Sequence, residues 1–530
     1  MKVFTWFTAL LVSLTWNAQP SSQSTILGIF GHIGKSHFYV FEPLLKALAA
    51  KGHEVTVISY FPQKKILPNY TDIDLHGSLT SLEPTGGVTF EDITGGSNFG
   101  SARMVLDLGA QDCERVYSHP SIIKLIHSEE KFDLVINELF NTDCYLGIAD
   151  RLKSPHIALS SHALTPWAND RFGNPDNPAY IPNLFLLLSN RMDFFERFQN
   201  TLTLLYHKII YYYISDTKGI PIFKKYLVNS SPLEELKRNT SLILVNSHFS
   251  LNQPRPLVPN VIEVGGIHFQ QPKNLPMATY NSPAKLSFIQ DLDKFISEAK
   301  HGVVYFSMGS MIRAETFPEE KRRAFLEAFS ELPQRVLWKW EGGELPDQPS
   351  NVLTQKWMPQ FDVLCHPNIR AYIGHGGLLG TLEAASRGVP MIGIPMFGDQ
   401  FNNMKSMAET GMGLILQYKD ITKNNVRQAL RAVLENPSYQ ENAKRVSRAF
   451  NDRPLSPLDT AVYWTEYVIR HRGAPHMRTA AVDMPWYQYL LLDVIAVLSI
   501  GACAIFYISY LTLATVYNLI LRTTSKTKTQ

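Results

Sequence analysis

The chain has 530 residues, of which 45% are hydrophobic and 18% charged, so it can bury a core in more than one domain. These values exclude a disordered or collagen-like chain. The 50 Lys and Arg against 47 Asp and Glu leave a formal charge of +3, too small for a protein that tracks nucleic-acid phosphates. The cysteines have no short spacing and predict neither a metal site nor a disulfide framework; they are Cys113, Cys144, Cys365 and Cys503.

The two ends of the chain predict a membrane protein of the secretory pathway. Residues 1–18 have the layout of a signal peptide, with Lys2 before an apolar stretch and small residues around the expected cleavage site at Ala18. Within a predicted anchor region at 486–521, Val494 to Leu521 carry no charge and are long enough to cross the bilayer and contact its lipids. Aromatic residues precede this span and basic residues follow it, which places the tail at 522–530 in the cytosol.

Short signals agree with this topology. The final Lys526-Thr527-Lys528-Thr529-Gln530 resembles the dilysine signal read by retrieval machinery of the endoplasmic reticulum. Asn-X-Ser/Thr triplets begin at Asn69, Asn229 and Asn239, as expected for lumenal exposure. We therefore expect a single-pass protein of the endoplasmic reticulum membrane, with its folded part in the lumen.

Between the ends, short β-rich runs alternate with helical stretches, which predicts parallel α/β sheets. Thr25–Phe30, a helical stretch and Glu54–Ser59 form the first strand–helix–strand unit. Pro and Gly become frequent from Asn252 to Pro283, which marks a domain seam. The sequence thus predicts two doubly wound, Rossmann-like domains, at 19–270 and 271–485, that face each other across a cleft.

In the rest of the first domain, two strands are predicted, whereas the stretch that begins at Phe185 has no single interpretation. Phe132–Ile136 and Pro155–Ser160 are typical of buried strands, around a helix that begins near Asp143. The apolar and aromatic stretch that begins at Phe185 has no single clean period. It is interpreted as helices that border a binding pocket, as a surface that touches the bilayer, or as ordinary helical core.

The residues that suggest chemistry in the second domain are concentrated between 357 and 400. They include Trp357-Met358-Pro359-Gln360, Gly374-His375-Gly376-Gly377, Glu383 and Phe397-Gly398-Asp399-Gln400. Together they resemble the signature of the UDP-glycosyltransferases, and Ile33-Gly34-Lys35-Ser36-His37-Phe38 resembles the insect branch. The resemblance implies a GT-B type fold, with the first domain binding the acceptor and the second the UDP-sugar.

The glycines of this stretch have a physical role of their own. Gly376 and Gly377 lie just after a predicted strand and open a helix, so backbone N–H groups can approach an anionic diphosphate closely. His375 beside them can donate to a phosphate oxygen. By resemblance, Ser307 and Ser310 belong to a loop that touches the same diphosphate, although a plain turn explains them equally well.

The resemblance also implies how uridine and sugar are held. Trp357 offers a flat face for uracil, unless it is a core aromatic, and Gln360 offers donor and acceptor groups for its edge. Glu383 would accept hydrogen bonds from ribose hydroxyls. Asp399 and Gln400, at the carboxyl end of a predicted strand, would hold the hydroxyls of the sugar.

A histidine suits the general base that deprotonates the acceptor hydroxyl, because its pKa lies near neutrality. His37 is the candidate, and His32 in the same loop is the rival. A carboxylate should orient this imidazole, as in Ser-His-Asp systems. Asp143 is preferred for this role because it fits the insect-like wording, although it could simply cap a helix, and Glu138, closer to the end of the strand, is the alternative.

The sequence therefore predicts an inverting transferase that moves a hexose from a UDP-sugar to a hydroxyl of a small lipophilic acceptor. UDP-glucose is the expected donor, with UDP-glucuronic acid second. No cofactor is expected beyond the co-substrate, and no metal, because the two Asp-X-Asp pairs, at 72 and 291, follow no convincing strand at a nucleotide site. The rival functions are a catalytically silent UDP-sugar-binding protein and a UDP-sugar isomerase; self-association is left open.

Overall fold

The structure is a computed structural model that describes residues 23–76, 89–94, 98–269 and 283–526. The predicted signal peptide at 1–18 lies outside these residues. The chain divides into two units, Met1–Arg478 and Thr479–Gln530, and each is described by itself.

The first unit contains a seven-stranded parallel sheet in the order β3-β2-β1-β4-β5-β6-β7. Its inner strands are buried nearly throughout, as expected where helices cover both faces of a parallel sheet. The order reverses between β1 and β4, and at such a switch point the carboxyl ends of the strands open a crevice. The strands are β1 (Thr25–Phe30), β2 (Glu54–Ser59), β3 (Tyr70–Asp74), β4 (Leu134–Glu138), β5 (His156–Ser160), β6 (Thr240–Val245) and β7 (Val261–Glu263).

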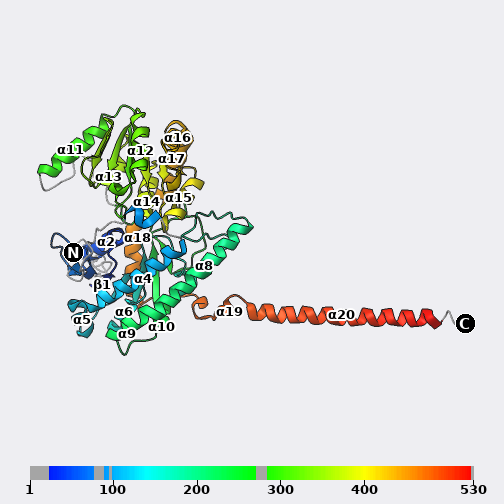
Figure 1. Ribbon diagram of the computed structural model, residues 1–530. Coiled ribbons are helices and arrows are strands. Elements are labelled where there is room, and N and C mark those ends of the chain that lie inside the picture. The colour runs from blue at the N-terminus through cyan, green and yellow to red at the C-terminus, as the bar shows by residue number, and fades with distance from the viewer. Residues whose placement is uncertain (1–22, 77–88, 95–97, 270–282, 527–530) are drawn as a thin grey trace, which may run out of the picture. The chain divides into compact units, whose positions relative to one another are not determined.

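Helices connect these strands, as Figure 1 shows. They are α2 (Lys35–Ala50), α3 (Phe90–Thr94), α4 (Asn98–Ser118), α5 (Pro120–His127), α6 (Leu146–Leu152), α7 (Asn169–Phe172), α8 (Phe194–Ile214), the π-helical η2 (Ser215–Gly219), α9 (Ile220–Tyr226) and α10 (Leu233–Arg238). The stretch after Phe185 contains α8, whose start is fixed by a capping box between Asp193 and Glu196. One face of α8 is buried, whereas the other exposes apolar side chains such as Phe198 and Ile209.

One prediction about the cysteines was wrong. Cys113 in α4 and Cys144 just before α6 form a disulfide, with their Cα atoms 6.1 Å apart. The two residues are 31 positions apart, and that spacing carries no local signal, so only the fold brings them together.

A second parallel sheet has six strands in the order β10-β9-β8-β11-β12-β13, so the α/β class with two doubly wound sheets is confirmed. Its strands are β8 (Val303–Ser307), β9 (Arg335–Lys339), β10 (Val352–Gln355), β11 (Ile369–Gly374), β12 (Met391–Gly393) and β13 (Gly413–Ile415). Its helices are α11 (Pro283–Ser297), α12 (Glu319–Ser330), α13 (Gln360–Cys365), α14 (Leu378–Arg387), α15 (Gln400–Glu409), α16 (Lys423–Glu435) and α17 (Pro437–Asn451), with 3-10 turns η4 (Ala314–Thr316) and η5 (Tyr418–Asp420).

The chain returns to the first sheet after α17. The helix α18 (Pro457–Arg470) begins at a Ser456 cap, packs on α2, and buries Ala461 and Val468 in the same core as β1. A 3-10 turn, η6 (Pro475–Met477), ends this part of the chain. The sequence places residues up to 485 in the second domain, but the structure gives α18 to the core of the first.

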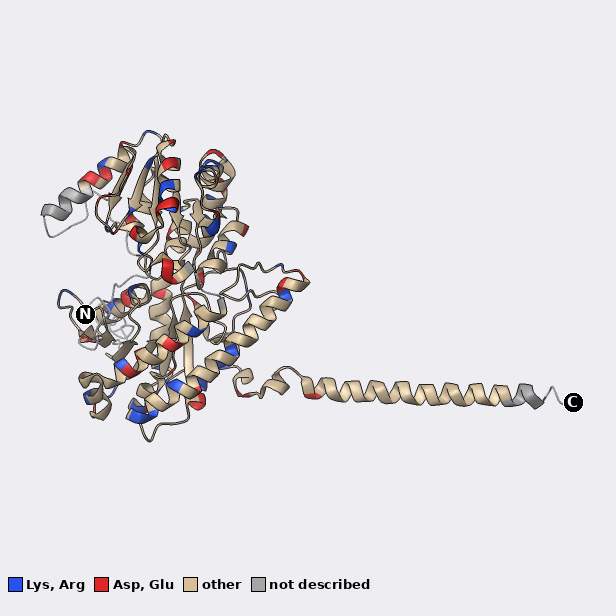
Figure 2. Cartoon of the chain, viewed as in Figure 1, with Lys and Arg blue, Asp and Glu red and all other residues tan. Residues whose placement is uncertain are grey.

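The second unit is dominated by one long apolar helix. After η7 (Ala480–Asp483) and α19 (Trp486–Tyr489), α20 runs over Leu492–Lys526. Its segment Leu492–Leu521 has a mean hydropathy of 2.2 and is long enough to cross a membrane, in agreement with the predicted span. Figure 2 shows that the body of this helix carries no charged side chain after the red residue near its start.

Candidate active site

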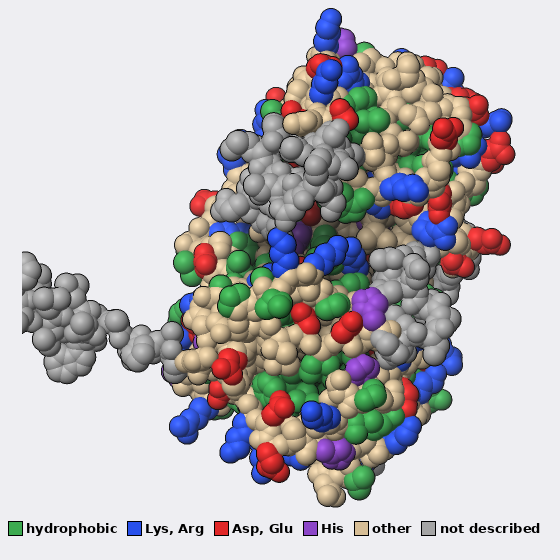
Figure 3. All heavy atoms as spheres, turned by 90° about the vertical axis from the view of Figure 1, so that its left-hand side faces the viewer, with side chains coloured by type: hydrophobic (Ala, Val, Ile, Leu, Met, Phe, Trp, Pro, Cys, Tyr) green, Lys and Arg blue, Asp and Glu red, His purple; other side chains and the backbone are tan. Residues whose placement is uncertain are grey.

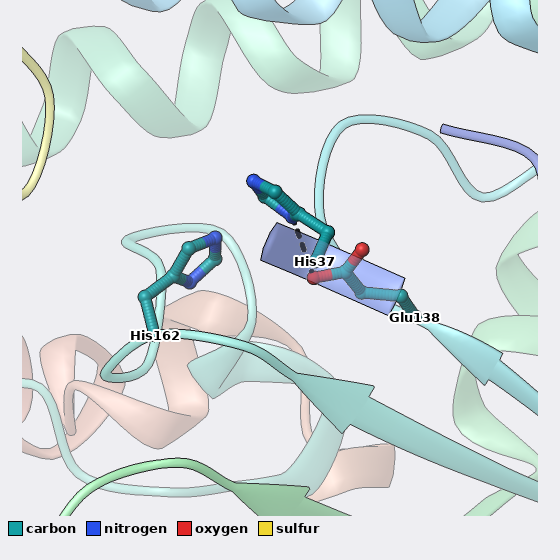
Figure 4. Close-up of side chains that lie close together, drawn as sticks. All are labelled: His37, Glu138 and His162. Carbon is teal, nitrogen blue, oxygen red and sulfur yellow. Dashed lines mark hydrogen bonds and ion pairs between the residues drawn. The ribbon is translucent and has the colours of Figure 1, made fainter. Parts of the chain in front are cut away.

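The first domain places a histidine and a carboxylate at the crevice between β1 and β4. His37 lies in the first turn of α2, shortly after the end of β1, and Glu138 is the last residue of β4. The Nδ1 atom of His37 is 2.8 Å from Oε1 of Glu138 (Figure 4). An ionised carboxylate only accepts hydrogen bonds, so Nδ1 carries the proton and Nε2 of the neutral ring keeps a lone pair. Such a ring can accept a proton at Nε2.

The environment tunes both groups in the direction a base requires. Burial lowers the pKa of His37, but the Glu138 carboxylate, with smaller help from Asp399 and Asp112, more than offsets it, so the pKa of His37 is raised. Burial alone would raise the pKa of Glu138, but His37 and a further hydrogen bond from Ser161 bring it down to about 2. Glu138 therefore stays ionised at neutral pH and can stabilise a protonated His37.

Asp143 does not contact His37, which corrects the pairing predicted from the sequence. Its carboxylate is buried and bonded to Arg171 and Tyr211, and Nζ of Lys237 lies 3.5 Å from Oδ2. Burial opposes ionisation, but these cations hold the pKa of Asp143 below its usual value. Asp143 thus joins α7, α8 and α10 to the loop before α6.

His32 is held by a separate carboxylate. Its Nδ1 is 2.9 Å from Oδ2 of Asp112, which also pairs with Arg115 at 2.9 Å. The rings of His32 and His37 are neighbours, with centroids 4.7 Å apart. His32 therefore belongs to the wall around His37 rather than to the Glu138 pair.

Two residues at this site were missed by the sequence analysis. Ser161 and His162 follow β5, and the Ser161 hydroxyl is 3.1 Å from Nδ1 of His37. The signal that could have found them was their place directly after the predicted strand Pro155–Ser160, since parallel strands end at one edge of a sheet. Figure 4 shows the His162 ring directed toward His37.

His37, Glu138 and His162 also form a group of possible metal ligands, with one ligand atom of each within 4.8 Å of the others. The 2.8 Å contact between His37 and Glu138 has the length of a hydrogen bond. Two ligands of a tetrahedral zinc ion lie farther apart, at about 3.3 Å, given metal–ligand bonds of about 2.0–2.1 Å. We therefore interpret the group as a proton-handling site.

In the second domain, His375 is enclosed by glycine backbone. A Cβ atom on Gly309 would lie 2.4 Å from Cε1 of His375, and one on Gly377 would lie 2.4 Å from its Nε2. Gly309 and Gly376 also have positive φ angles of 79° and 82°, which glycine adopts at low cost. Burial and nearby Lys339 lower the pKa of His375 to about 4, so the ring is neutral. Its Nδ1 is buried and has no hydrogen-bond partner among the described residues.

The predicted uridine-binding residues are joined by hydrogen bonds. The Gln360 side chain donates to Oε2 of Glu383 at 2.6 Å and accepts from the Tyr305 hydroxyl at 3.2 Å. It therefore orients Glu383, whose other oxygen lies 3.6 Å from Nε2 of His268. Trp357 is 57% exposed, so it is not a core aromatic and its face can accept a stacked ring.

The sugar-binding candidates lie at the start of α15. Asp399 is the residue before this helix and accepts a bond of 2.8 Å from Asn403, which also donates to the Gly376 carbonyl at 3.0 Å. The Gln400 side-chain oxygen accepts from the backbone of Met396 at 2.9 Å and so shapes the preceding loop. Ser307 does the same for its turn by accepting from Gly309 at 3.2 Å, and Ser310 is exposed.

Electrostatic effects act between residues of the two domains. The Asp399 carboxylate acts on His37 and His162 of the first domain. The pKa of Lys35, the first residue of α2, is lowered mainly by burial. The nearby cations Lys64 and Lys339 lower it further. Figure 3 shows Lys and Arg side chains grouped at mid-height on one face of the first unit, Met1–Arg478. Lys339 donates to the Gly309 carbonyl at 2.8 Å, and a cation beside this glycine turn suits an anionic ligand such as a diphosphate.

Comparisons with known proteins agree with this geometry. A family described as "UDP-glucoronosyl and UDP-glucosyl transferase" matches residues 32–527. The chain is 44% identical to UDP-glucosyltransferase 2 of Dactylopius coccus over 508 residues, which is 94% of each chain. It is 47% identical to UDP-glycosyltransferase UGT5 of the same insect over 89% of this chain and 88% of that one.

More distant proteins are also similar. The chain is 32% identical to human UDP-glucuronosyltransferase 1A9 over 90% of its length and 88% of the relative. Among solved structures, the calicheamicin glycosyltransferase CalG4 matches 85% of this chain and 99% of its own, with a TM-score of 0.51 and 17% identity. This last likeness concerns the GT-B fold alone.

Proposed function

The chain belongs to the UDP-glycosyltransferase family, and from this premise we propose that it is an inverting enzyme that moves glucose from UDP-glucose to a hydroxyl of a small lipophilic acceptor. Glucose is preferred because the similar insect protein is named a UDP-glucosyltransferase. UDP-glucuronic acid is the second candidate donor, as used in the name of the human relative.

The observation that carries the proposal is the bond between His37 and Glu138 at the switch point of the first sheet. It leaves a lone pair on Nε2, in a ring that is influenced by Asp399 of the second domain. A base within electrostatic reach of the predicted sugar-binding residue Asp399 is suited to act on a hydroxyl at the anomeric carbon.

The reaction then follows from the roles of the residues. Nε2 of His37 takes the proton of the acceptor hydroxyl while the oxygen of that hydroxyl bonds to the anomeric carbon. At the same time, the bond from the anomeric carbon to the β-phosphate oxygen breaks. Attack from the opposite face inverts the configuration and gives a β-glycoside. Glu138 stabilises the imidazolium, and the glycine turns around His375 with nearby Lys339 stabilise the charge on UDP.

The location is part of the proposal. The apolar segment Leu492–Leu521 would anchor the enzyme in the endoplasmic reticulum membrane, with the transferase in the lumen and a short cytosolic tail. Asn69, Asn229 and Asn239 are all exposed, so each could carry a glycan there. An anchored enzyme would meet acceptors that partition into lipid.

Product analysis tests this function. Membranes bearing the protein are incubated with UDP-glucose or UDP-glucuronic acid and a panel of phenols and sterols, and UDP, conjugate and its anomeric configuration are measured. We expect acceptor-dependent release of UDP and a β-glucoside. Binding of UDP without conjugate would favour the silent binding protein, and a changed donor sugar without acceptor would favour an isomerase.

A further inference from the structure

His162 is a second imidazole at the active site that the proposed reaction does not use. It lies just after β5 and is 8% exposed. Its ring centroid is 5.7 Å from that of His37 and 5.1 Å from that of Phe140. Its position beside the proposed base is shown in Figure 4.

The hydrogen bonds of His162 identify which nitrogen carries the proton. The Ser160 hydroxyl donates to the backbone oxygen of His162 at 2.9 Å, so it is an acceptor toward Nδ1, 3.2 Å away. The Ala163 carbonyl, 3.3 Å from Nδ1, is also an acceptor. Nδ1 therefore bears the hydrogen, and Nε2 of the neutral ring keeps a lone pair. Burial, and then the nearby His37, lower the pKa of His162, so the ring remains neutral.

The lone pair on Nε2 has no partner within the described part of the chain. The atom is buried, and a buried acceptor without a hydrogen bond is costly enough to be rare in native proteins. The partner that would satisfy it must be a donor. A sugar hydroxyl meets this requirement, whereas a carboxylate or phosphate oxygen does not.

The surroundings indicate where that hydroxyl comes from. One ligand atom of His162 lies within 4.8 Å of those of His37 and Glu138, so the ring is next to the proposed reacting atoms. The Asp399 carboxylate, a predicted sugar-binding group, also acts on His162. His162 therefore lies next to the proposed base and within electrostatic reach of the proposed sugar-binding residue of the second domain.

We propose that Nε2 of His162 accepts a hydrogen bond from a hydroxyl of the transferred hexose, which makes His162 a residue that determines donor-sugar specificity. This inference rests on the proposed transferase function. It extends the sugar site into the first domain, whereas the residues predicted from the sequence to hold the sugar all lie in the second.

Binding measurements on the full chain in detergent test the proposal. We expect His162→Ala to weaken UDP-glucose binding about three- to tenfold, the effect of one neutral hydrogen bond, and to leave UDP binding unchanged. Unchanged UDP binding also shows that the nucleotide-binding domain of the variant is folded. His162→Gln should recover part of the loss, because its amide oxygen can accept the same bond. The pH at which activity rises should not change, because His37, the proposed base, is unaltered.

Monodeoxy analogues of UDP-glucose identify the hydroxyl. One analogue should bind the native protein as weakly as UDP-glucose binds His162→Ala, and the variant should no longer distinguish the two. Equal losses for UDP and UDP-glucose, or a change only in the KM of the acceptor, would overturn the proposal. Conjugate formation by the native protein separately tests the proposed function, so a native transferase without these losses contradicts the role of His162 alone.

Discussion

The two α/β domains form their sides of the site from different ranges of sequence. In the first domain, His37, Glu138 and Ser161 come from three strand ends and are joined by hydrogen bonds across 101 and 124 residues. In the second domain, most of the groups lie between Trp357 and Asn403, where the bonds span 4 to 27 residues, and the end of β8 adds Tyr305, which bonds to Gln360, and Gly309, which lies against His375. The first side depends on the order and register of a sheet, and the second on the local geometry of turns.

This difference agrees with the division of roles proposed for the two domains. Moving a proton needs side chains that meet at one point, and neighbouring strands supply them from distant parts of the chain. Holding a diphosphate needs backbone N–H groups, which a glycine turn before a helix supplies locally. A substitution at His37 or Glu138 should therefore act on the chemical step, and one at the glycine turns around His375 on nucleotide binding.

The largest expected effect is on the chemical step. We expect His37→Ala to lower kcat about 10²- to 10⁴-fold, because the variant lacks the proposed general base, while UDP still binds. The matched control is His32→Ala, which removes the adjacent ring but leaves the Glu138 bond intact, and it should keep most of the native rate. Initial rates of conjugate formation measure both. A greater loss in His32→Ala would transfer the base role to the rival histidine.

Substitutions of Asp143 and Glu138 should differ in their effects, the first acting mainly on stability and the second mainly on activity. Asp143→Asn leaves Arg171 buried without its charged partner, so the free energy of unfolding should fall by about 3–5 kcal/mol. Glu138→Gln should change stability less and slow the reaction more. Denaturation and activity per folded molecule are compared for both. A stable but inactive Asp143→Asn protein would restore Asp143 to the catalytic pair.

A smaller effect is expected in the nucleotide half. Gly309→Ala places a Cβ atom 2.4 Å from His375 at a residue with positive φ, so the turn must shift. UDP affinity should fall about tenfold, because a factor of ten corresponds to about 1.4 kcal/mol, which lies within the roughly 1–3 kcal/mol of a strained backbone position. The matched control is Gly343→Ala, where a Cβ meets nothing within 4 Å. Calorimetric titration with UDP measures both, and equal affinities would contradict the enclosing role of the glycine.

The same contrast explains what could be predicted from the sequence. The expected strands Thr25–Phe30 and Glu54–Ser59 coincide with β1 and β2, because buried parallel strands are continuous apolar runs. The predicted strand Phe132–Ile136 ended two residues before β4 does, so Glu138 was placed outside the strand, and Asp143 was preferred because it fits the insect-like wording. The edge strand β3 was missed because Thr71, Asp72 and Asp74 make it polar.

The remaining omissions are long-range contacts. The disulfide of Cys113, the return of α18 to the first sheet and the approach of His162 to His37 all join residues far apart in the chain. A single sequence carries no local pattern for such contacts. The stretch from 357 to 400 was accessible because its elements follow one another directly.

The pH dependence of kcat/KM tests the central claim most directly, since it reports the essential base of the free enzyme. Because Glu138 raises the pKa of His37, activity in the native enzyme should rise with pH along a limb above the ordinary histidine value near 6.5. In Glu138→Gln the attraction to the carboxylate is removed and burial still lowers the pKa, so the limb should move to lower pH as the maximal rate falls. A limb at the same pH in both proteins would contradict the pairing of His37 with Glu138.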